Sequence, residues 1–242
     1  RHAPYGDLRE AFGGAGRRIG AGPEQRRLRN GLLTGEVTLA FLLLVCAGIL
    51  ANSFIRLNRV PLGFSPDHVW TFRALLRGDQ YQDSQQLTNA HRSLADRIDA
   101  VPGVAGVVLA NATPLAGGES RPFVPAGRAT DGSAESPRGT LHVVSPNYFN
   151  LLGVRRLAGQ QFSPADSAGA PRVAVVNLNL ARRYFSGGDP IGQRLTILKG
   201  PSVSAVPVGE VEIVGVVDNV RDVGVDEVPF ACIYLPIAQN PV

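Results

Sequence analysis

The longest apolar stretch of the chain lies near its N-terminal end. Residues 37–55 include only three polar side chains, those of Thr38, Asn52 and Ser53. A helix rises about 1.5 Å per residue, so a helix of this stretch nearly spans the ~30 Å hydrocarbon core of a bilayer. Its apolar residues occur on every face, which a core helix in a chain of this size would rarely tolerate. The pattern predicts a transmembrane helix over 31–55.

A cleaved signal peptide is the main alternative for this stretch. Signal peptides have a short basic leader, a short apolar core and a cleavage site of small residues, whereas roughly 30 residues precede the run here. Residues 43–46 have the outline of a lipoprotein cleavage site, but Val45 is large where a small side chain is needed. The transmembrane interpretation is therefore favoured.

Beyond a linker at 56–68 that is rich in Pro and Gly, the pattern predicts one folded domain over 69–242. A mixture of β-branched and aromatic residues predicts a strand at 69–75. Apolar residues at spacings of three and four predict a helix over 83–101, and a second strand is expected at 104–110. These three elements form a predicted β-α-β unit.

The rest of the domain is richer in predicted strands, which fall at 141–144, 173–176, 195–198, 211–217 and 231–235. Ser145 and Pro146 are expected to begin one helix, and Asn177 is expected to cap another over 178–186. Residues 111–140, rich in Gly, Pro, Ala and Ser, predict an inserted loop-rich part. Because helices occur only intermittently among the strands, the predicted class is α+β.

Helical spacing also predicts which side chains of the two longer helices are buried. The side chains expected to be buried are Leu94, Ile98, Leu180 and Phe185. The arginines that fall outside this apolar stripe, and are expected to be exposed, are Arg97, Arg182 and Arg183.

Charge is distributed unevenly along the chain. Residues 1–30 carry seven arginines against three acidic residues, whereas the other 212 residues carry 17 basic and 17 acidic groups. Basic residues before a span favour a cytoplasmic N-terminus, with 56–242 on the other side of the membrane. Residues 25–30 are either a simple positive anchor or a segment lying on anionic lipid. The distal part has no basic excess to neutralise phosphates, which argues against nucleic-acid binding.

Motifs of catalytic chemistry are missing from the sequence. Lys199 is the only lysine, and Gly200 and Pro201 follow it, so the chain has no phosphate-binding loop and is not an ATPase by itself. A Gly-x-Ser-x-Gly nucleophile motif is also missing. We therefore expect no catalytic residue, no cofactor and no enzymatic activity, and a membrane-anchored hydrolase is disfavoured.

Metal-binding spacings are missing as well. The four histidines are His2, His68, His91 and His142. They show no paired spacing, and the sequence has no Cys-x-x-Cys, so no metal site is expected. His142, inside an apolar strand, is interpreted as a packed histidine.

Two further groups of residues have a simple interpretation. The acidic residues near the C-terminal end are Asp218, Asp222, Asp226 and Glu227. Their irregular spacing around Arg221 favours a solvated turn over a cation site. Cys46 and Cys232 are expected to be free thiols on opposite sides of a membrane boundary.

Several short motifs occur in a specific order along most of the chain. They are Pro61-Leu62-Gly63-Phe64, Leu94-Ala95-Asp96-Arg97-Ile98, Val101-Pro102-Gly103-Val104, Thr113-Pro114-Leu115, Val144-Ser145-Pro146-Asn147-Tyr148-Phe149, Ala174-Val175-Val176-Asn177, Ala181-Arg182-Arg183-Tyr184-Phe185, Asp189-Pro190-Ile191-Gly192 and Ile213-Val214-Gly215-Val216-Val217. Together they resemble MacB-like ABC transporter permeases of the FtsX superfamily, and more narrowly the second half of duplicated permeases of an acidobacterial type.

This resemblance implies a non-catalytic permease component of the bacterial inner membrane, with a role in export or mechanotransmission. Its extracytoplasmic core would combine porter-like β-α-β units with a β-rich inserted subdomain, supplied here by 111–140. The implied partners are a separate ABC ATPase subunit, other transmembrane helices of the same permease, membrane lipid and a periplasmic protein. We expect the sequence to be a segment of a longer protein. A single-pass anchored binding or sensor module remains the alternative.

Overall fold

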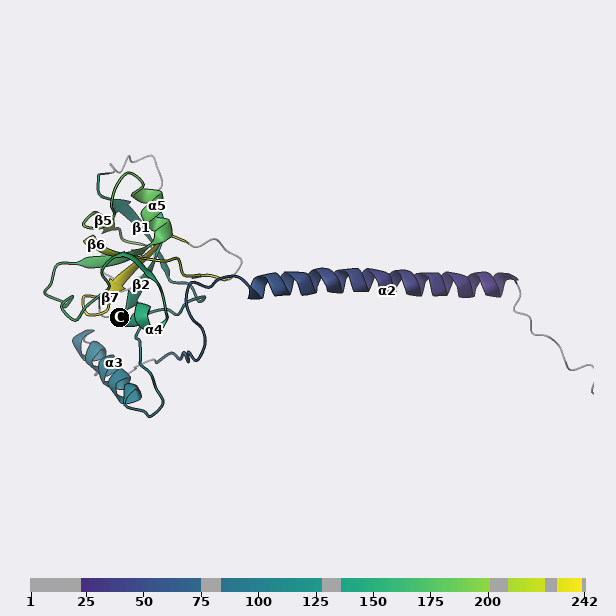
Figure 1. The fold of residues 1–242 in the computed structure, drawn as a ribbon, viewed down its shortest axis with the longest axis horizontal. Coiled ribbons are helices and arrows are strands. Elements are labelled where there is room, and N and C mark those ends of the chain that lie inside the picture. Colours follow the sequence, from purple (N-terminus) through teal and green to yellow (C-terminus); the bar gives the residue numbers. More distant parts are fainter. Residues whose placement is uncertain (1–22, 75–83, 128–135, 201–208, 225–229, 241–242) are drawn as a thin grey trace, which may run out of the picture. The chain divides into compact units, whose positions relative to one another are not determined.

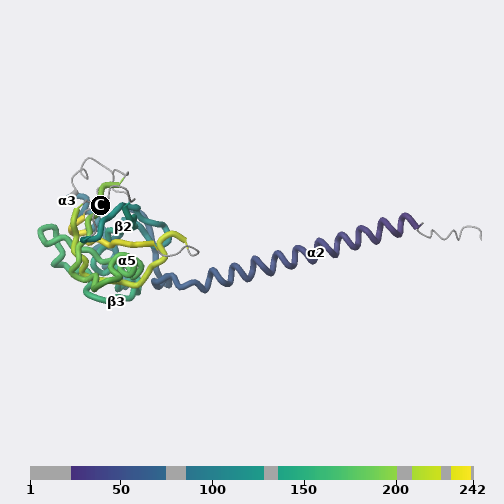
Figure 2. Tube along the Cα trace, turned by 90° about the horizontal axis from the view of Figure 1, so that it is seen from above, coloured from purple at the N-terminus to yellow at the C-terminus, as the bar shows by residue number. Residues whose placement is uncertain are grey.

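The computed structural model describes residues 23–74, 84–127, 136–200, 209–224 and 230–240. It divides into two units, Arg1–Arg59 and Val60–Val242, and each is described by itself (Figures 1 and 2).

In the described part of the first unit, Pro23–Asn58 form one continuous helix, α2, none of whose residues is buried. Its 36 residues correspond to about 54 Å, which exceeds the thickness of the hydrocarbon core. The hydroxyl groups of Thr34 and Thr38 donate to backbone carbonyls one turn earlier, at 2.8 and 2.7 Å, so neither is unsatisfied in an apolar surrounding. The helix is long and apolar enough to cross a membrane, and it includes the predicted span 31–55.

The second unit is built around a seven-stranded sheet in the order β3-β6-β4-β7-β2-β1-β5 (Figure 1). Its strands are β1 (Glu119–Pro125), β2 (Arg138–Val144), β3 (Arg156–Gly159), β4 (Val173–Asn177), β5 (Arg194–Ile197), β6 (Gly209–Val217) and β7 (Cys232–Pro236). Strand β5 pairs with both β1 and β6. The sheet therefore closes on itself through β6, β4, β7, β2, β1 and β5. The pairs β2–β7 and β4–β6 are parallel, and the other pairs are antiparallel.

Apolar side chains form one cluster inside this ring and another outside it. Every strand of the ring contributes to the first cluster, as Ile233 does from β7, and Leu180 of α5 (Leu178–Tyr184) joins it. The second cluster contains strand side chains that point away from the first cluster, such as Tyr234 of β7. It also contains Phe149 of α4 (Tyr148–Leu151). Because successive side chains of a strand point to opposite faces, both faces of β7 are covered. All five of its residues are buried.

The β4–α5 connection has the structure that the sequence predicts. Four apolar residues are followed by Asn177, which is the last residue of the buried strand β4, has an extended backbone and is the N-cap of α5. Its side-chain oxygen accepts from the backbone N–H of Leu180 at 3.0 Å, as an N-cap asparagine does. The same oxygen accepts from Cys232 N at 3.0 Å, and the amide nitrogen donates to Phe230 O at 2.7 Å. One fully buried side chain thus joins β4, α5 and the start of β7.

Most of the predicted elements are confirmed. The predicted strands after residue 140 correspond to β2, β4, β5, β6 and β7, the helix expected over 83–101 is α3 (Ser84–Asp99), and the α+β class holds. Leu180 and Phe185 are buried, whereas Arg97, Arg182 and Arg183 are exposed, all as predicted. Cys46 and Cys232 are free thiols.

The β-α-β unit expected around α3 is wrong. Residues 69–74 and 104–109 form no strand, and Ala110 makes only an isolated bridge to Val144. No strand forms here because no strand among the described residues lies beside this segment to complete its hydrogen bonds. Trp70 is 93% exposed. Leu75 lies outside the described residues. Leu94 and Ile98 are only half-buried and join neither cluster, so their predicted burial is wrong too.

Two local predictions also need correction. The range 111–140, predicted to be loop-rich from its composition, contains β1 and the start of β2, and Phe123 of β1 is fully buried in the ring. The N-cap of α4 is Asn147 instead of Ser145. The Ser145 hydroxyl accepts from Leu109 N at 3.1 Å and donates to Asn147 Oδ1 at 2.8 Å.

Replacing a leucine by alanine should reduce the stability of the domain more in α5 than in α3. Leu180→Ala empties a fully buried position and is expected to lower the free energy of unfolding by about 2 to 5 kcal/mol. Leu94→Ala removes a half-buried side chain and is expected to cost about 1 kcal/mol or less. Denaturant titration of the full chain in detergent, followed by thiol labelling of Cys232 in a Cys46→Ala background, measures both. Equal losses would contradict the structure.

Candidate functional site

The segment that follows α2 is fastened to the second unit. Leu62 O accepts from Arg221 N at 2.9 Å, and Ser65 N donates to Leu152 O at 2.8 Å. The Phe64 side chain packs against the second apolar cluster. The range 56–68, expected to be a linker, is therefore helical up to Asn58 and part of the domain from residue 62 onward.

Gly63 allows this segment to approach the loop that follows β6. Its φ is +81°, and a Cβ atom there would lie 2.0 Å from Asn219 O and 3.0 Å from the Cα of Val220. Both obstacles are backbone atoms, which cannot rotate away as a flexible side chain can. Only glycine fits this contact without a shift of the backbone.

The 218–222 loop is the structural element that receives the segment. Asp218 N donates to Arg155 O at 2.8 Å, and Asn219 Oδ1 accepts from Asn179 N at the start of α5 at 2.9 Å. On the other side, Arg221 O accepts from Leu115 N at 3.3 Å, and Asp222 O accepts from Gly117 N at 2.7 Å. Five consecutive residues thus connect the segment after α2 with the main elements of the domain.

One end of the loop carries an exposed ion pair. Arg155 Nη2 donates to Asp218 Oδ2 at 2.8 Å. Partial burial raises the pKa of Asp218, but the hydrogen bonds from Arg155 and from Asn219 N outweigh it, and the net effect lowers this pKa. Because the arginine is largely exposed, solvent screens the pair and its contribution to stability is small.

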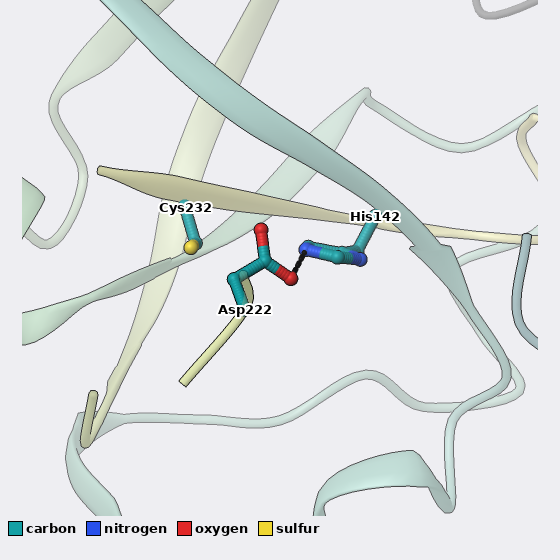
Figure 3. A group of neighbouring side chains, drawn as sticks. All are labelled: His142, Asp222 and Cys232. Atoms are coloured by element: carbon teal, nitrogen blue, oxygen red, sulfur yellow. Dashed lines mark ion pairs between the residues drawn. The ribbon is translucent and has the colours of Figure 1, made fainter. Parts of the chain in front are cut away.

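The other end of the loop enters the protein interior. His142 of β2 donates from Nε2 to Asp222 Oδ1 at 2.8 Å, and Cys232 at the start of β7 lies beside them (Figure 3). The exposed fractions of these side chains are at most 4%. The interpretation of Asp222 as part of a solvated turn is therefore wrong, while Asp226 and Glu227 lie outside the described residues. His142 is packed as predicted, but with an acidic partner.

Aromatic rings enclose this cluster of His142, Asp222 and Cys232. The imidazole stacks on Tyr234, with ring centroids 5.3 Å apart. Burial raises the pKa of the Cys232 thiol, and the charge of Asp222 raises it further. Burial likewise raises the pKa of Tyr148 and Tyr234. Near neutral pH, Cys232 is therefore a thiol and not the thiolate that attacks substrates.

No pattern in the sequence brings these three residues together. Asp222 belongs to a group of acidic residues that is expected to be exposed, and His142 and Cys232 lie on strands that are distant in the sequence. Their ligand atoms lie within 4.8 Å of one another, which makes them a group that could hold a metal ion. The one signal in the sequence is that two apolar strands each carry a metal-ligating residue, His142 in β2 and Cys232 in β7. These residues can be placed on the same face of the sheet only when the pairing of β2 with β7 is known.

Comparison with known protein families gives one match over most of the chain. The model of the MacB-like periplasmic core domain matches residues 37–240. No curated protein matches the chain.

Three solved structures are similar to parts of the chain. The periplasmic region of MacB from Actinobacillus actinomycetemcomitans is 16% identical, with a TM-score of 0.43 over 61% of this chain and 55% of that one. The extracellular domain of the noncanonic ABC-type transporter YknZ from Gram-positive bacteria is 18% identical (TM-score 0.40, 59% of each chain). A domain of a putative permease protein from Porphyromonas gingivalis is 21% identical (TM-score 0.39, 62% and 58%). The matched part thus spans little more than half of each structure.

Proposed function

The chain belongs to the family of MacB-like periplasmic core domains, and on this premise we propose that it is a non-catalytic part of an ABC-type permease. In this proposal a separate subunit hydrolyses ATP, and the resulting movement of α2 is passed to the extracytoplasmic domain. The system serves export or mechanotransmission.

The short connection between α2 and the domain carries this proposal. Only Arg59, Val60 and Pro61 separate the last residue of α2 from Leu62, whose carbonyl is bonded to the domain. The four Cα–Cα steps from Asn58 to Leu62 span at most about 14 Å when fully extended, and Pro61 has a fixed φ. A larger displacement of α2 cannot be absorbed by the connection, so it must move the domain.

The proposed orientation follows from charge. Arg26, Arg27 and Arg29 lie in the first turns of α2, ahead of its apolar part, whereas Arg56 and Arg59 follow it more sparsely. Cytoplasmic flanks of a span carry the excess of basic residues. This supports a cytoplasmic N-terminus in the bacterial inner membrane, with residues 56–242 in the periplasm. Further transmembrane helices of the same permease, lipid and a periplasmic protein are the remaining proposed partners.

Co-purification tests the proposed role. The parent protein, tagged and extracted in mild detergent, is expected to retain a subunit with a phosphate-binding loop and to hydrolyse ATP as a complex. An unrelated single-span protein with the same tag serves as the control. Recovery of the protein without any ATPase subunit would contradict the permease and favour a single-pass binding or sensor module.

A further inference from the structure

The cluster of His142, Asp222 and Cys232 presents three different metal-ligating atoms toward one buried point. The residues come from β2, from the 218–222 loop and from β7, and their ligand atoms all lie within 4.8 Å of one another (Figure 3). In the close-up, the Asp222 carboxylate lies between the imidazole and the thiol. His142 Nε2 and Asp222 Oδ1 are 2.8 Å apart.

The hydrogen bonding of this cluster is incomplete. Asp222 Oδ2 and His142 Nδ1 are buried and have no hydrogen-bond partner among the described residues. The Cys232 thiol donates to Phe230 O at 3.6 Å. A buried acceptor without a partner costs about 1 to 3 kcal/mol of folding free energy. A cation bound to Asp222 Oδ2 would remove this cost.

We propose that His142, Asp222 and Cys232 bind a divalent transition-metal ion of the Zn²⁺ class. Imidazole nitrogen, carboxylate oxygen and thiolate sulfur are all ligands of Zn²⁺, whereas Ca²⁺ and Mg²⁺ select oxygen ligands alone. With metal–ligand distances of about 2.0 to 2.3 Å, tetrahedral ligands lie about 3.3 to 3.8 Å apart. His142 Nε2 and Asp222 Oδ1, at 2.8 Å, are closer than this range, and all three ligand atoms lie within 4.8 Å of one another. Shifts of about an ångström complete the site, and water takes the fourth position.

Charge and proton balance are consistent with such a site. The Cys232 thiol loses its proton to solvent as the sulfur binds, because a coordinating thiol is deprotonated. The imidazole gives up the Nε2 proton that it donates to Asp222 and takes one at Nδ1, so it stays neutral and binds the metal through Nε2. One thiolate and one carboxylate then neutralise a dication, so the interior acquires no net charge.

A metal ion here would act on the loop that receives the segment after α2. Asp222 is adjacent to Arg221, whose N–H holds Leu62. Coordination would fix the 218–222 loop to β2 and β7 at the same time. The assignment of the ion does not depend on the proposed permease function, because it rests on the ligand geometry alone.

Cobalt substitution tests the site directly. The full chain in detergent, stripped with a chelator, is titrated with Co²⁺, which gives a thiolate-to-metal charge-transfer band when a cysteine binds it. We expect one equivalent to produce the band and Zn²⁺ to displace it. Cys46→Ala should behave as the wild type, whereas Cys232→Ser should lose the band. Asp222→Asn and His142→Gln should each weaken Co²⁺ binding at least 10-fold.

A second measurement uses the unaltered chain and does not depend on the folding of any variant. Zn²⁺ should slow the reaction of Cys232 with a thiol reagent at least 10-fold, while Mg²⁺ should leave it unchanged. No charge-transfer band in the wild type, or a band that depends on Cys46, would overturn the proposal. The same holds if Zn²⁺ leaves the reactivity of Cys232 unchanged, whatever the variants do.

Discussion

Asn177→Ala is expected to lower the free energy of unfolding of the second unit by about 3 kcal/mol, among the largest effects of any single polar substitution. The fully buried side chain accepts from the N–H groups of Leu180 and Cys232 and donates to Phe230 O. Alanine removes the N-cap, at a cost of about 1 kcal/mol. It also leaves the buried N–H of Cys232 without its acceptor, at about 1 to 3 kcal/mol more.

Denaturant titration of the full chain in detergent measures this loss, with the thiol of Cys232 as probe in a Cys46→Ala background. Asn150→Ala is the matched control, since Asn150 is an exposed asparagine of α4, and its effect should stay within about 0.5 kcal/mol. A loss below 1 kcal/mol for Asn177→Ala would show that this side chain does not join β4, α5 and β7.

Gly63→Ala is expected to detach the segment after α2 from the 218–222 loop while the rest of the domain stays folded. The added Cβ would lie 2.0 Å from Asn219 O, and an alanine at positive φ is itself strained by about 1 to 2 kcal/mol. A weakening of the contact by at least 2 kcal/mol corresponds to about a 30-fold faster hydrogen exchange of the Arg221 N–H. The proposed function predicts that coupling of ATP hydrolysis to the domain is lost as well.

Gly103→Ala is a control that distinguishes the steric clash expected in Gly63→Ala from the strain of an alanine at positive φ. Gly103 has a φ of +94°, but a Cβ there would meet nothing within 4 Å. This variant shares the unfavourable φ, yet it should leave the exchange of the Arg221 N–H as in the wild type. An unchanged exchange rate at Arg221 in Gly63→Ala would refute the proposed attachment.

Local sequence predicts an element well where the element depends on its own residues. Residues 173–176 followed by Asn177 give both the buried strand β4 and the capped start of α5, because apolar side chains and a cap act within one short stretch. The helix α2 can likewise be predicted from its own long apolar stretch, because a helix satisfies its backbone hydrogen bonds internally.

Elements that depend on a distant partner are predicted poorly. Residues 69–74 have the composition of a strand but no strand beside them, whereas β1 lies in a range with a weak pattern and is held by β2 and β5. Strand β3, whose residues are all exposed, is defined only by its pairing with β6. Composition indicates that a segment favours the extended conformation, but the segment forms a strand only if another strand pairs with it.

The buried cluster was missed for the same reason. A carboxylate such as that of Asp222 in a stretch of acidic residues is normally exposed. Its burial depends on His142, which lies 80 positions earlier in the sequence.

The position of β7 in the sheet has a consequence for the order of folding. β7 follows the other strands in the sequence, yet it lies between β4 and β2 and pairs residue 234 with residue 142. Contacts between residues so far apart in the chain form late and slowly. Until β7 is available, the edges of β2 and β4 that it joins are therefore unpaired, and such edges attract other unpaired strands. This risk of aggregation lasts until residues 232–236 have been synthesised and have paired.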